Sequence, residues 1–370
     1  MSQSSDSEHS LGSTEVLHPV SVLSAAAILA RRDVPELRAL VSARKKGWNE
    51  ESLDDHFKWQ RNVADNPDDT VAFTWFRMMK KVLKEVDFAS PGCIPAIKPI
   101  EFLDVACSPG GFSSYVLGKN KRARGIGISL PESKGGHAFL LEHEYMSRYE
   151  FIEKDILEYD LEPLDVGGTF DTARKFPGKL LGRFPLVFMD GHALRTYQHP
   201  RLTELAQDEW RAAHGSYRSS LLIAQLIIGL ESVTPGGTII TRLSHVECFP
   251  SAVILYLLDQ LSEKLVLHKP RAMHMSRGTC YVVAKGVGGV RCAKARRLYL
   301  AGLRKLLLEL RHDGPDGHGR MLAPGDLDFI ATTDTILDEY LDRLIKLARG
   351  VWATQVEGLN HLFRKKGIQP

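Results

Sequence analysis

Residues 102–112 read Phe-Leu-Asp-Val-Ala-Cys-Ser-Pro-Gly-Gly-Phe, an apolar run that leads into a turn of small residues. The run ends at Asp104 and Val105, and the turn opens a segment with helical character. In an open α/β sheet, ligands bind beyond the carboxyl ends of the strands, where such turns lie. Gly110 and Gly111 carry no side chain that would keep a ligand from the backbone, and a helix N-terminus presents free N–H groups. The stretch therefore predicts a ligand-binding turn, although it matches neither the dinucleotide pattern G-x-G-x-x-G nor the P-loop.

The chain around this turn alternates apolar runs with helical stretches. The apolar runs that predict strands are 101–105, 125–128, 151–152, 186–189, 238–241, 265–267 and 280–284. The stretches that predict helices between them are 111–118, 137–148, 216–233 and 250–263. Alternation of this kind favours an α/β fold, here a seven-stranded, mostly parallel sheet covered on both faces.

Composition and patterning divide the 370 residues into four zones. The Ser-rich, acidic residues 1–15 are expected to be a disordered tail, and 16–95 form an N-terminal helical region. The sheet domain takes up 96–290, and 291–370 form a C-terminal helical region. With 44% apolar and 25% charged residues, the composition excludes a wholly disordered or fibrous chain. The net charge of +3 does not by itself indicate a polyanionic partner.

Cysteine spacing and hydropathy set the expected compartment. The five cysteines are scattered and none is spaced as a zinc ligand, so we expect reduced thiols and no metal site. No run of 18 apolar residues occurs, and the first 15 residues read as neither a signal nor a transit peptide. The chain is therefore expected to be intracellular, cytoplasmic or nuclear, with no membrane partner.

The phrase Asp-x-x-x-x-Pro-Gly-Gly-Phe-Ser, which begins at Asp104, resembles the S-adenosylmethionine-binding turn of FtsJ-type ribose 2′-O-methyltransferases. Five other segments match the same family in the same order: Trp75–Arg77, Glu153–Ile156, Phe188–Gly191, Val233–Arg242 and Lys269–Ala284. The resemblance therefore covers about residues 70–288. The resemblance implies a Rossmann-like, class I methyltransferase fold with helical N- and C-terminal extensions. It also implies S-adenosyl-L-methionine as cofactor and methylation of RNA.

The same resemblance assigns the residues that would bind the cofactor. They are Asp104, Ala106, Cys107, Ser108, Pro109, Gly110, Gly111, Phe112, Ser129, Leu130, Asp155, Ile156 and Asp190. Asp155 closes the third strand, where the family accepts a hydrogen bond from the adenine amino group. Ser129 stands where the family ends its second strand with an acidic residue, and Glu132 is a substitute from the following turn.

The catalytic set departs from the family pattern. The family uses Lys-Asp-Lys-Glu, and the matching positions here are Arg77, Asp190, Arg242 and Thr279, of which only the aspartate is kept. A guanidinium group stays protonated in proteins, so an arginine does not act as a general base, but its donors bind phosphate or developing charge. His192, two residues after Asp190, is a candidate replacement base. His245, three residues after Arg242, is a second candidate base of the same kind, and Glu247 is a weaker one.

The expected partner is RNA, along three basic segments. These are Arg195–Arg201, the insertion Pro163–Phe184 and the helix at 291–311, which carries seven basic residues against Glu309 alone. A protein partner could bind through the helical extensions. The sequence thus leaves three functions open: an RNA ribose 2′-O-methyltransferase, a catalytically inactive relative that binds the cofactor, RNA or a protein, and a small-molecule O-methyltransferase.

Overall fold

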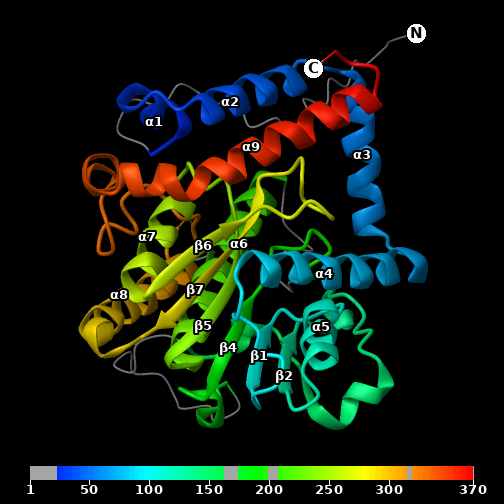
Figure 1. Ribbon diagram of the computed structural model, residues 1–370, viewed down its shortest axis with the longest axis vertical. Helices are drawn as coiled ribbons and strands as arrows, with labels where there is room; N and C mark the ends of the chain where they lie inside the picture. The colour runs from blue at the N-terminus through cyan, green and yellow to red at the C-terminus, as the bar shows by residue number, and fades with distance from the viewer. Residues whose placement is uncertain (1–22, 162–173, 199–206, 315–318, 370) are drawn as a thin grey trace.

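The computed structural model describes residues 23–161, 174–198, 207–314 and 319–369 (Figure 1). Seven strands form one sheet in the order β3-β2-β1-β4-β5-β7-β6. Strand β7 is antiparallel to its two neighbours, and all other neighbouring pairs are parallel. The strands are β1 (Glu101–Val105), β2 (Arg124–Ser129), β3 (Tyr149–Glu153), β4 (Phe184–Met189), β5 (Val233–Ser244), β6 (Lys264–His268) and β7 (Thr279–Val287). The expected fold class and all seven expected strands are confirmed, whereas the predicted tail 1–15 lies outside the described residues.

The strand order fixes where a ligand can bind. From β1 the chain builds outward through β2 to β3, and it then returns to place β4 on the other side of β1. The connections that leave the carboxyl ends of β1 and β4 therefore diverge, and open α/β sheets bind ligands in the crevice at such a switch point.

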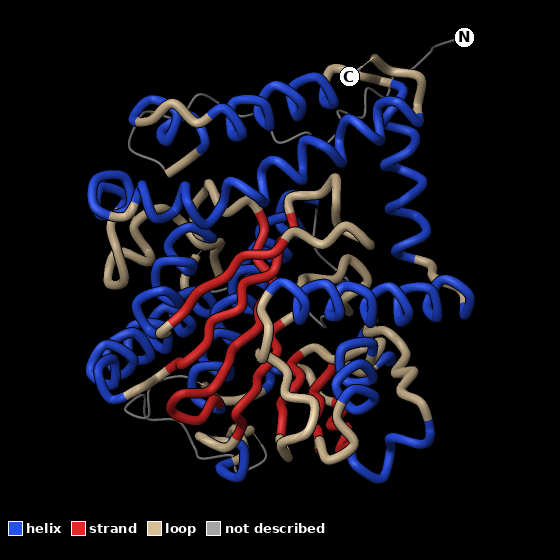
Figure 2. The backbone as a smooth tube through the Cα atoms, viewed as in Figure 1, coloured by secondary structure: helices blue, strands red, loops and turns tan. Residues whose placement is uncertain are grey.

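Alternating side chains divide the sheet into two apolar faces. Phe102, Phe188 and Tyr281 face one layer, in which the helices α4 (Asp69–Ala89) and α5 (Gly111–Lys119) pack. Leu103, Met189 and their neighbours face the other layer, which is formed by the helices α6 (Gln207–Ser232), α7 (Ser251–Leu261) and α8 (Ala293–His312). The sheet therefore lies between two helical layers, as Figure 2 shows.

The remaining helices come from the two ends of the chain and lie beyond one edge of the sheet domain (Figure 1). They are α1 (Ala25–Arg31), α2 (Pro35–Trp48), α3 (Ser52–Asp65) and α9 (Leu341–Lys365), with a π-helical turn over Thr335–Glu339. Helix α9 runs alongside α2, and a buried carboxylate, Glu247, joins both to the chain just after β5. Its oxygens accept hydrogen bonds from Arg44 of α2 (2.6 Å) and from the indole N–H of Trp352 of α9 (3.0 Å). None of the helices in the described part of the chain combines the length and apolarity that a bilayer crossing requires.

The predicted helix at 137–148 is wrong. The chain there has no regular secondary structure as far as Glu142, and only His143–Arg148 form a 3₁₀ helix. The ring of Phe139 stacks on Phe151 with centroids 4.2 Å apart, and the backbone N–H of Leu140 donates to Pro109. The segment covers the glycine turn, and these tertiary contacts outweigh the local helical pattern.

Two of the three expected RNA-binding segments have other roles in the structure. In α8, Arg296 donates to backbone carbonyls at the end of α6, and Arg304 pairs with Glu231. In the insertion, residues 162–173 are not described, and Arg183 pairs with Glu101 at the amino end of β1. These arginines therefore hold elements together or lie at the amino end of β1, away from the glycine turn. Other basic residues of the two segments are exposed, among them Lys294, Arg297 and Lys305 of α8, so RNA binding along these segments stays a prediction.

Candidate active site

The turn after β1 is fixed by hydrogen bonds from both sides. The backbone N–H groups of Ala106 and Cys107 both donate to the carbonyl of Ile128, and they hold Ala106 at a left-handed φ of 63°. Gly110 caps helix α5 with a φ of 100°, a conformation that favours glycine. Any Cβ on Gly111 would lie 2.6 Å from the backbone oxygen of Phe76 in α4. The two glycines thus serve different needs, a left-handed turn and close helix packing.

Asp104 anchors the turn from below. Its carboxylate is buried and accepts the hydroxyl of Ser113 at 2.6 Å. Burial raises the pKa of Asp104 to about 7, against the lowering effect of the Ser113 hydrogen bond, and the nearby charge of Asp190 raises it further. Asp104 therefore supports the first turn of α5 from inside the protein.

Two serine side chains at the turn, those of Ser108 and Ser129, are polar groups suited to a ligand. The backbone N–H of Ser108 donates to Ser129 at 3.3 Å, so the hydroxyl that replaces the family's acidic residue braces the turn. The hydroxyl oxygen of Ser108 is itself buried without a hydrogen-bond partner among the described residues. Because an unpaired buried hydroxyl is costly, this oxygen marks a place where a ligand would supply the missing partner. Pro109 and Phe112 are buried in the turn and in the core, and Leu130 is half-buried after β2.

Asp155 follows β3 and lies beside two stacked tyrosines. One of its carboxylate oxygens accepts from the backbone of Leu157 (2.9 Å), and the other accepts from the hydroxyl of Tyr197 (2.7 Å). The Tyr197 ring stacks on Tyr217 with centroids 3.9 Å apart. Ile156 is buried next to Asp155. Tyr197 belongs to the basic-aromatic segment that we expected to bind RNA, but its hydroxyl is directed to the predicted cofactor residue.

Asp190 closes β4 and carries the charge at the centre of the site. Its Oδ1 accepts from the hydroxyl of Tyr281 (2.9 Å) and lies 3.5 Å from Nε of Arg242. Its Oδ2 has no hydrogen-bond partner within the described chain. Burial raises the pKa of Asp190, whereas the charge of Arg242 and the Tyr281 hydrogen bond lower it. The structure thus brings Asp190 and Arg242 together as the resemblance implies.

Three histidines lie around this pair, and only one of them was predicted. The charge of Arg242 lowers the pKa of His192, which is exposed in the loop two residues after Asp190. Its electrostatic neighbours include His137, which packs against Trp75 of α4, and His274. His274 is 8% exposed, and neither ring nitrogen has a partner among the described residues. Burial lowers the pKa of His274 to about 3, so its ring is neutral near pH 7.

Among the described residues, no hydrogen bond or ion pair joins the other candidate residues from the sequence to Asp190 or Arg242. Arg77 is exposed on α4, and the contacts of the described residues do not join it to Asp190. Thr279 accepts the buried Nζ of Lys269 at its backbone oxygen (2.6 Å). Glu247 is fully engaged by the terminal helices, and the Nδ1 of His245 lies 3.5 Å from it, so both belong to that junction. Glu132 is exposed in the turn after β2.

Part of the chain matches a known protein family and several known proteins. Residues 79–287 match the model of the FtsJ-like methyltransferases. The cap-specific mRNA (nucleoside-2′-O-)-methyltransferase 1 of Bos taurus is 27% identical over 268 residues, which are 70% of this chain and 29% of that protein. The protein of the same name from Danio rerio is 28% identical over 222 residues, 58% of this chain and 25% of its own length. An inactive cap-specific mRNA (nucleoside-2′-O-)-methyltransferase 1B of Caenorhabditis briggsae is 25% identical over 255 residues, 65% of this chain and 27% of that protein.

The chain therefore spans little more than a quarter of the length of the curated relatives that it matches. A solved ribosomal RNA methyltransferase of Plasmodium falciparum is 17% identical and covers 56% of this chain and 95% of its own, with a TM-score of 0.33.

Proposed function

This chain belongs to the FtsJ-like methyltransferase family, and we propose that it transfers the methyl group of S-adenosylmethionine to a ribose 2′-hydroxyl of RNA. The observation that carries the proposal is Asp190, a carboxylate whose side chain is 13% exposed at the switch point of the sheet, with one oxygen hydrogen-bonded and the other left for a substrate. The names of the relatives support the acceptor, because they describe 2′-O-methylation of mRNA. An RNA acceptor also supports an intracellular site of action, nuclear or cytoplasmic.

The residues after β1, β2 and β3 fit the cofactor. The turn from Ala106 to Phe112 offers a backbone that only small residues cover, and the unpartnered hydroxyl of Ser108 points to a missing polar ligand. Asp155 can accept the adenine amino group, since each of its oxygens retains a second lone pair beyond the bond that it already accepts. Ser129 accepts one hydrogen bond within the turn and keeps its own hydroxyl proton for the ribose, and Glu132 is the acidic candidate for the same role.

Bound S-adenosylmethionine supplies a methyl group on a sulfonium; as the oxygen–carbon bond forms, the sulfur–carbon bond breaks and the hydroxyl proton must leave. Oδ2 of Asp190 would accept that hydroxyl and orient its oxygen toward the methyl group. As the methyl group transfers, the single hydroxyl proton would pass by way of Oδ2 of Asp190 to His192, two residues further along the chain, whose ring is neutral at pH 7 because its pKa is lowered.

Arg242 takes the place of the family's central lysine but supplies a different chemistry. Its guanidinium charge beside Asp190 favours the ionised form of that carboxylate, whereas burial raises the pKa of Asp190. The same charge keeps His192 neutral. In this proposal the positive charge stays at the lysine position, whereas proton removal moves to the histidine. Arg77, exposed on α4, remains a proposed phosphate contact.

A methyl-transfer assay tests the proposal. The full chain is incubated with radiolabelled S-adenosylmethionine and RNA, and product nucleosides are separated after digestion. We expect 2′-O-methyl nucleosides from the wild type, none from Asp190→Ala and a strong reduction for His192→Asn. No label in RNA from a folded protein that binds the cofactor would overturn the proposed reaction.

One alternative has specific support. The loss of the family's lysine and glutamate to Arg242 and Thr279, together with a relative named inactive, favours a non-catalytic protein that binds the cofactor or RNA. Calorimetry separates the two functions: cofactor binding without transfer to any RNA supports the alternative. Methyl transfer that Asp190→Ala abolishes supports the enzyme.

A further inference from the structure

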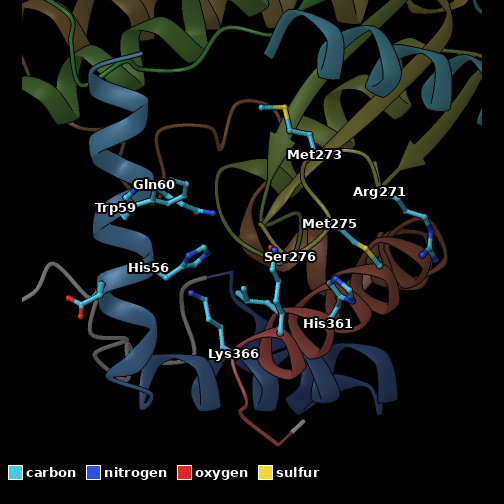
Figure 3. A pocket seen from close by; sticks show the side chains of 13 residues that line it. His56, Trp59, Gln60, Arg271, Met273, Met275, Ser276, His361 and Lys366 are labelled. Atoms are coloured by element: carbon cyan, nitrogen blue, oxygen red, sulfur yellow. The ribbon is translucent and has the colours of Figure 1, made fainter. Parts of the chain in front are cut away.

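A pocket of about 780 Å³ lies between α3, the loop before β7 and the end of α9 (Figure 3). Its walls include His56, Trp59 and Gln60 of α3, Met275 of the loop, and His361 and Lys366 at the other side. Figure 3 shows His56, Gln60 and Lys366 pointing into the space between these elements. Both helical walls lie outside residues 79–287, so the family match does not account for the pocket. Its volume falls within the range of about 300–1,000 Å³ that is usual for ligand sites.

Helix α3 is held away from the body of the protein by polar contacts. Among its described residues only Leu53 is buried. Arg277, in the loop before β7, donates to the side chain of Gln60 (2.8 Å), and Arg195 donates to Asp65 near the end of the helix (2.7 Å). Because these contacts fix α3 at a distance, Trp59 stays 61% exposed at the pocket instead of packing into a core.

The pocket combines an aromatic platform with unpaired positive charge. The rings of Trp59 and His56 stack with an interplanar angle of 22°. Lys365 and Lys366 line the opposite side, and neither forms an ion pair with a carboxylate among the described residues. Asp55 is the one acidic residue in the lining of the described pocket. Single-stranded nucleic acids are bound by this combination, in which a base stacks on an aromatic ring and cationic groups follow the phosphates. A protein interface would instead have few lysines at its centre.

A chain of contacts joins this pocket to the candidate active site. The hydroxyl of Tyr281 donates to Asp190, and the ring of Tyr281 lies 6.4 Å from that of His274, measured between centroids. Burial lowers the pKa of His274, and the charge of Arg277, which also contacts Gln60, lowers it further. The loop that carries His274 and Arg277 therefore lies next to Tyr281, the hydrogen-bond partner of Asp190, and its residues Met273, Met275 and Ser276 line the pocket.

We propose that this pocket binds a nucleotide of single-stranded RNA, with its base on Trp59 and its phosphates at Lys365 and Lys366. This nucleotide belongs to the same strand as the acceptor ribose, so the inference rests on the proposed function. The terminal helices thus contribute an RNA site that the methyltransferase domain alone does not contain.

Equilibrium RNA binding tests the aromatic half of the site. A fluorescently labelled, unstructured RNA of about a dozen nucleotides is titrated with the full chain, and anisotropy gives Kd. Loss of base stacking on alanine substitution predicts about tenfold or weaker binding for Trp59→Ala, with recovery in Trp59→Phe. The matched control is Trp48→Ala, because Trp48 is 60% exposed on α2 and does not line the pocket. Equal affinity of the Trp59→Ala and Trp48→Ala proteins would overturn the proposal and would favour a protein segment as occupant.

Salt dependence tests the charged half. Replacing Lys365 and Lys366 by alanine should reduce the slope of log Kd against log salt by about 0.7 for each phosphate that the variant no longer neutralises. The control replaces Lys121, which precedes β2, and Lys264, which begins β6; both are exposed and neither lines the pocket, so the slope should be unchanged. An equal slope in the two double variants would contradict the assignment of phosphates to this pocket.

The two proposals fail separately. If methyl transfer depends on Asp190 but Trp59→Ala alters neither Kd nor KM for RNA, the proposed function stands and the pocket assignment is wrong. If Trp59→Ala weakens RNA binding and no RNA is methylated, the pocket assignment stands and the proposed reaction is wrong. Thermal unfolding of each variant verifies that the exposed substitutions leave the fold intact.

Discussion

Glu247 joins the terminal helices to the end of β5, and its replacement by glutamine measures the strength of that junction. The side chain is 1% exposed and accepts hydrogen bonds from Arg44 and Trp352. Burial alone would raise the pKa of Glu247, but the hydrogen bond from His245 and the charge of Arg44 outweigh burial and lower the pKa from 4.5 to about 2. The carboxylate is therefore far more favourable in the folded state than its protonated form.

The sign and size of the effect follow from proton linkage. The folded state holds the carboxyl proton less tightly than the unfolded state, so the stabilisation is complete above pH 4.5 and is lost as the pH falls toward 2. At about 1.4 kcal/mol for each pKa unit, this lowering is worth about 3 kcal/mol at pH 7, of which about 1 kcal/mol remains at pH 3. Removing one partner of a buried ion pair costs a similar amount, roughly 3–5 kcal/mol, because the other charge is left uncompensated. We therefore expect Glu247→Gln to lower the free energy of unfolding by about 3 kcal/mol at pH 7.

Urea unfolding followed by tryptophan fluorescence measures the loss at a series of pH values between 7 and 3. The difference between wild type and Glu247→Gln should shrink as the pH falls, whereas Glu263→Gln, at an exposed glutamate, should show almost no difference at any pH. A difference that is small at pH 7, or that is constant from pH 7 to 3, would refute the assignment of Glu247 as an ionised anchor.

Three further predictions concern the site. In calorimetry, Asp155→Ala should abolish binding of S-adenosylmethionine. Tyr197→Phe frees one oxygen of the same carboxylate, so this variant should bind the cofactor at least as tightly as wild type. If the Asp155→Ala protein bound as tightly as wild type, the assignment of Asp155 to the adenine site would be contradicted. Gly111→Ala places a Cβ 2.6 Å from a backbone oxygen of α4 and should lower stability by about 1–3 kcal/mol in thermal unfolding, a result that an unchanged midpoint would exclude. Because the pKa of His192 is lowered from 6.5, the rate of methyl transfer should be constant from pH 7 to 9 and should fall only at lower pH. In Arg242→Lys, the rate should also rise at alkaline pH if the new lysine becomes the base.

The sheet could be predicted from the sequence because its strands are short apolar runs with clear turn residues between them. The run at 102–105 and the small residues that follow predicted the first strand and a turn into a helix, and the structure has both; ligand binding at the turn stays a prediction. Asp190 and Arg242 end neighbouring parallel strands, so their approach could be expected from strand order alone.

Features that depend on distant contacts could not be read in the same way. The segment at 137–148 has a helical pattern, but Phe139 stacks on the third strand, and the chain before His143 has no regular secondary structure. The basic residues of α8 suggested a solvent-facing track, yet Arg296 is used to satisfy carbonyls of another helix. His274 carried no local signal, since only the folded loop buries its ring beside Tyr281. The pocket at Trp59 likewise joins segments that are about 300 residues apart in the sequence.

The measurement that tests the central claim most directly is methyl transfer to two matched RNAs, one with ordinary riboses and one with 2′-deoxyribose at every position. The account predicts that the wild type transfers label from S-adenosylmethionine to the first RNA and not to the second, and that Asp190→Ala transfers to neither. Equal labelling of both RNAs, or transfer that survives in Asp190→Ala, would contradict a 2′-hydroxyl acceptor oriented by Asp190.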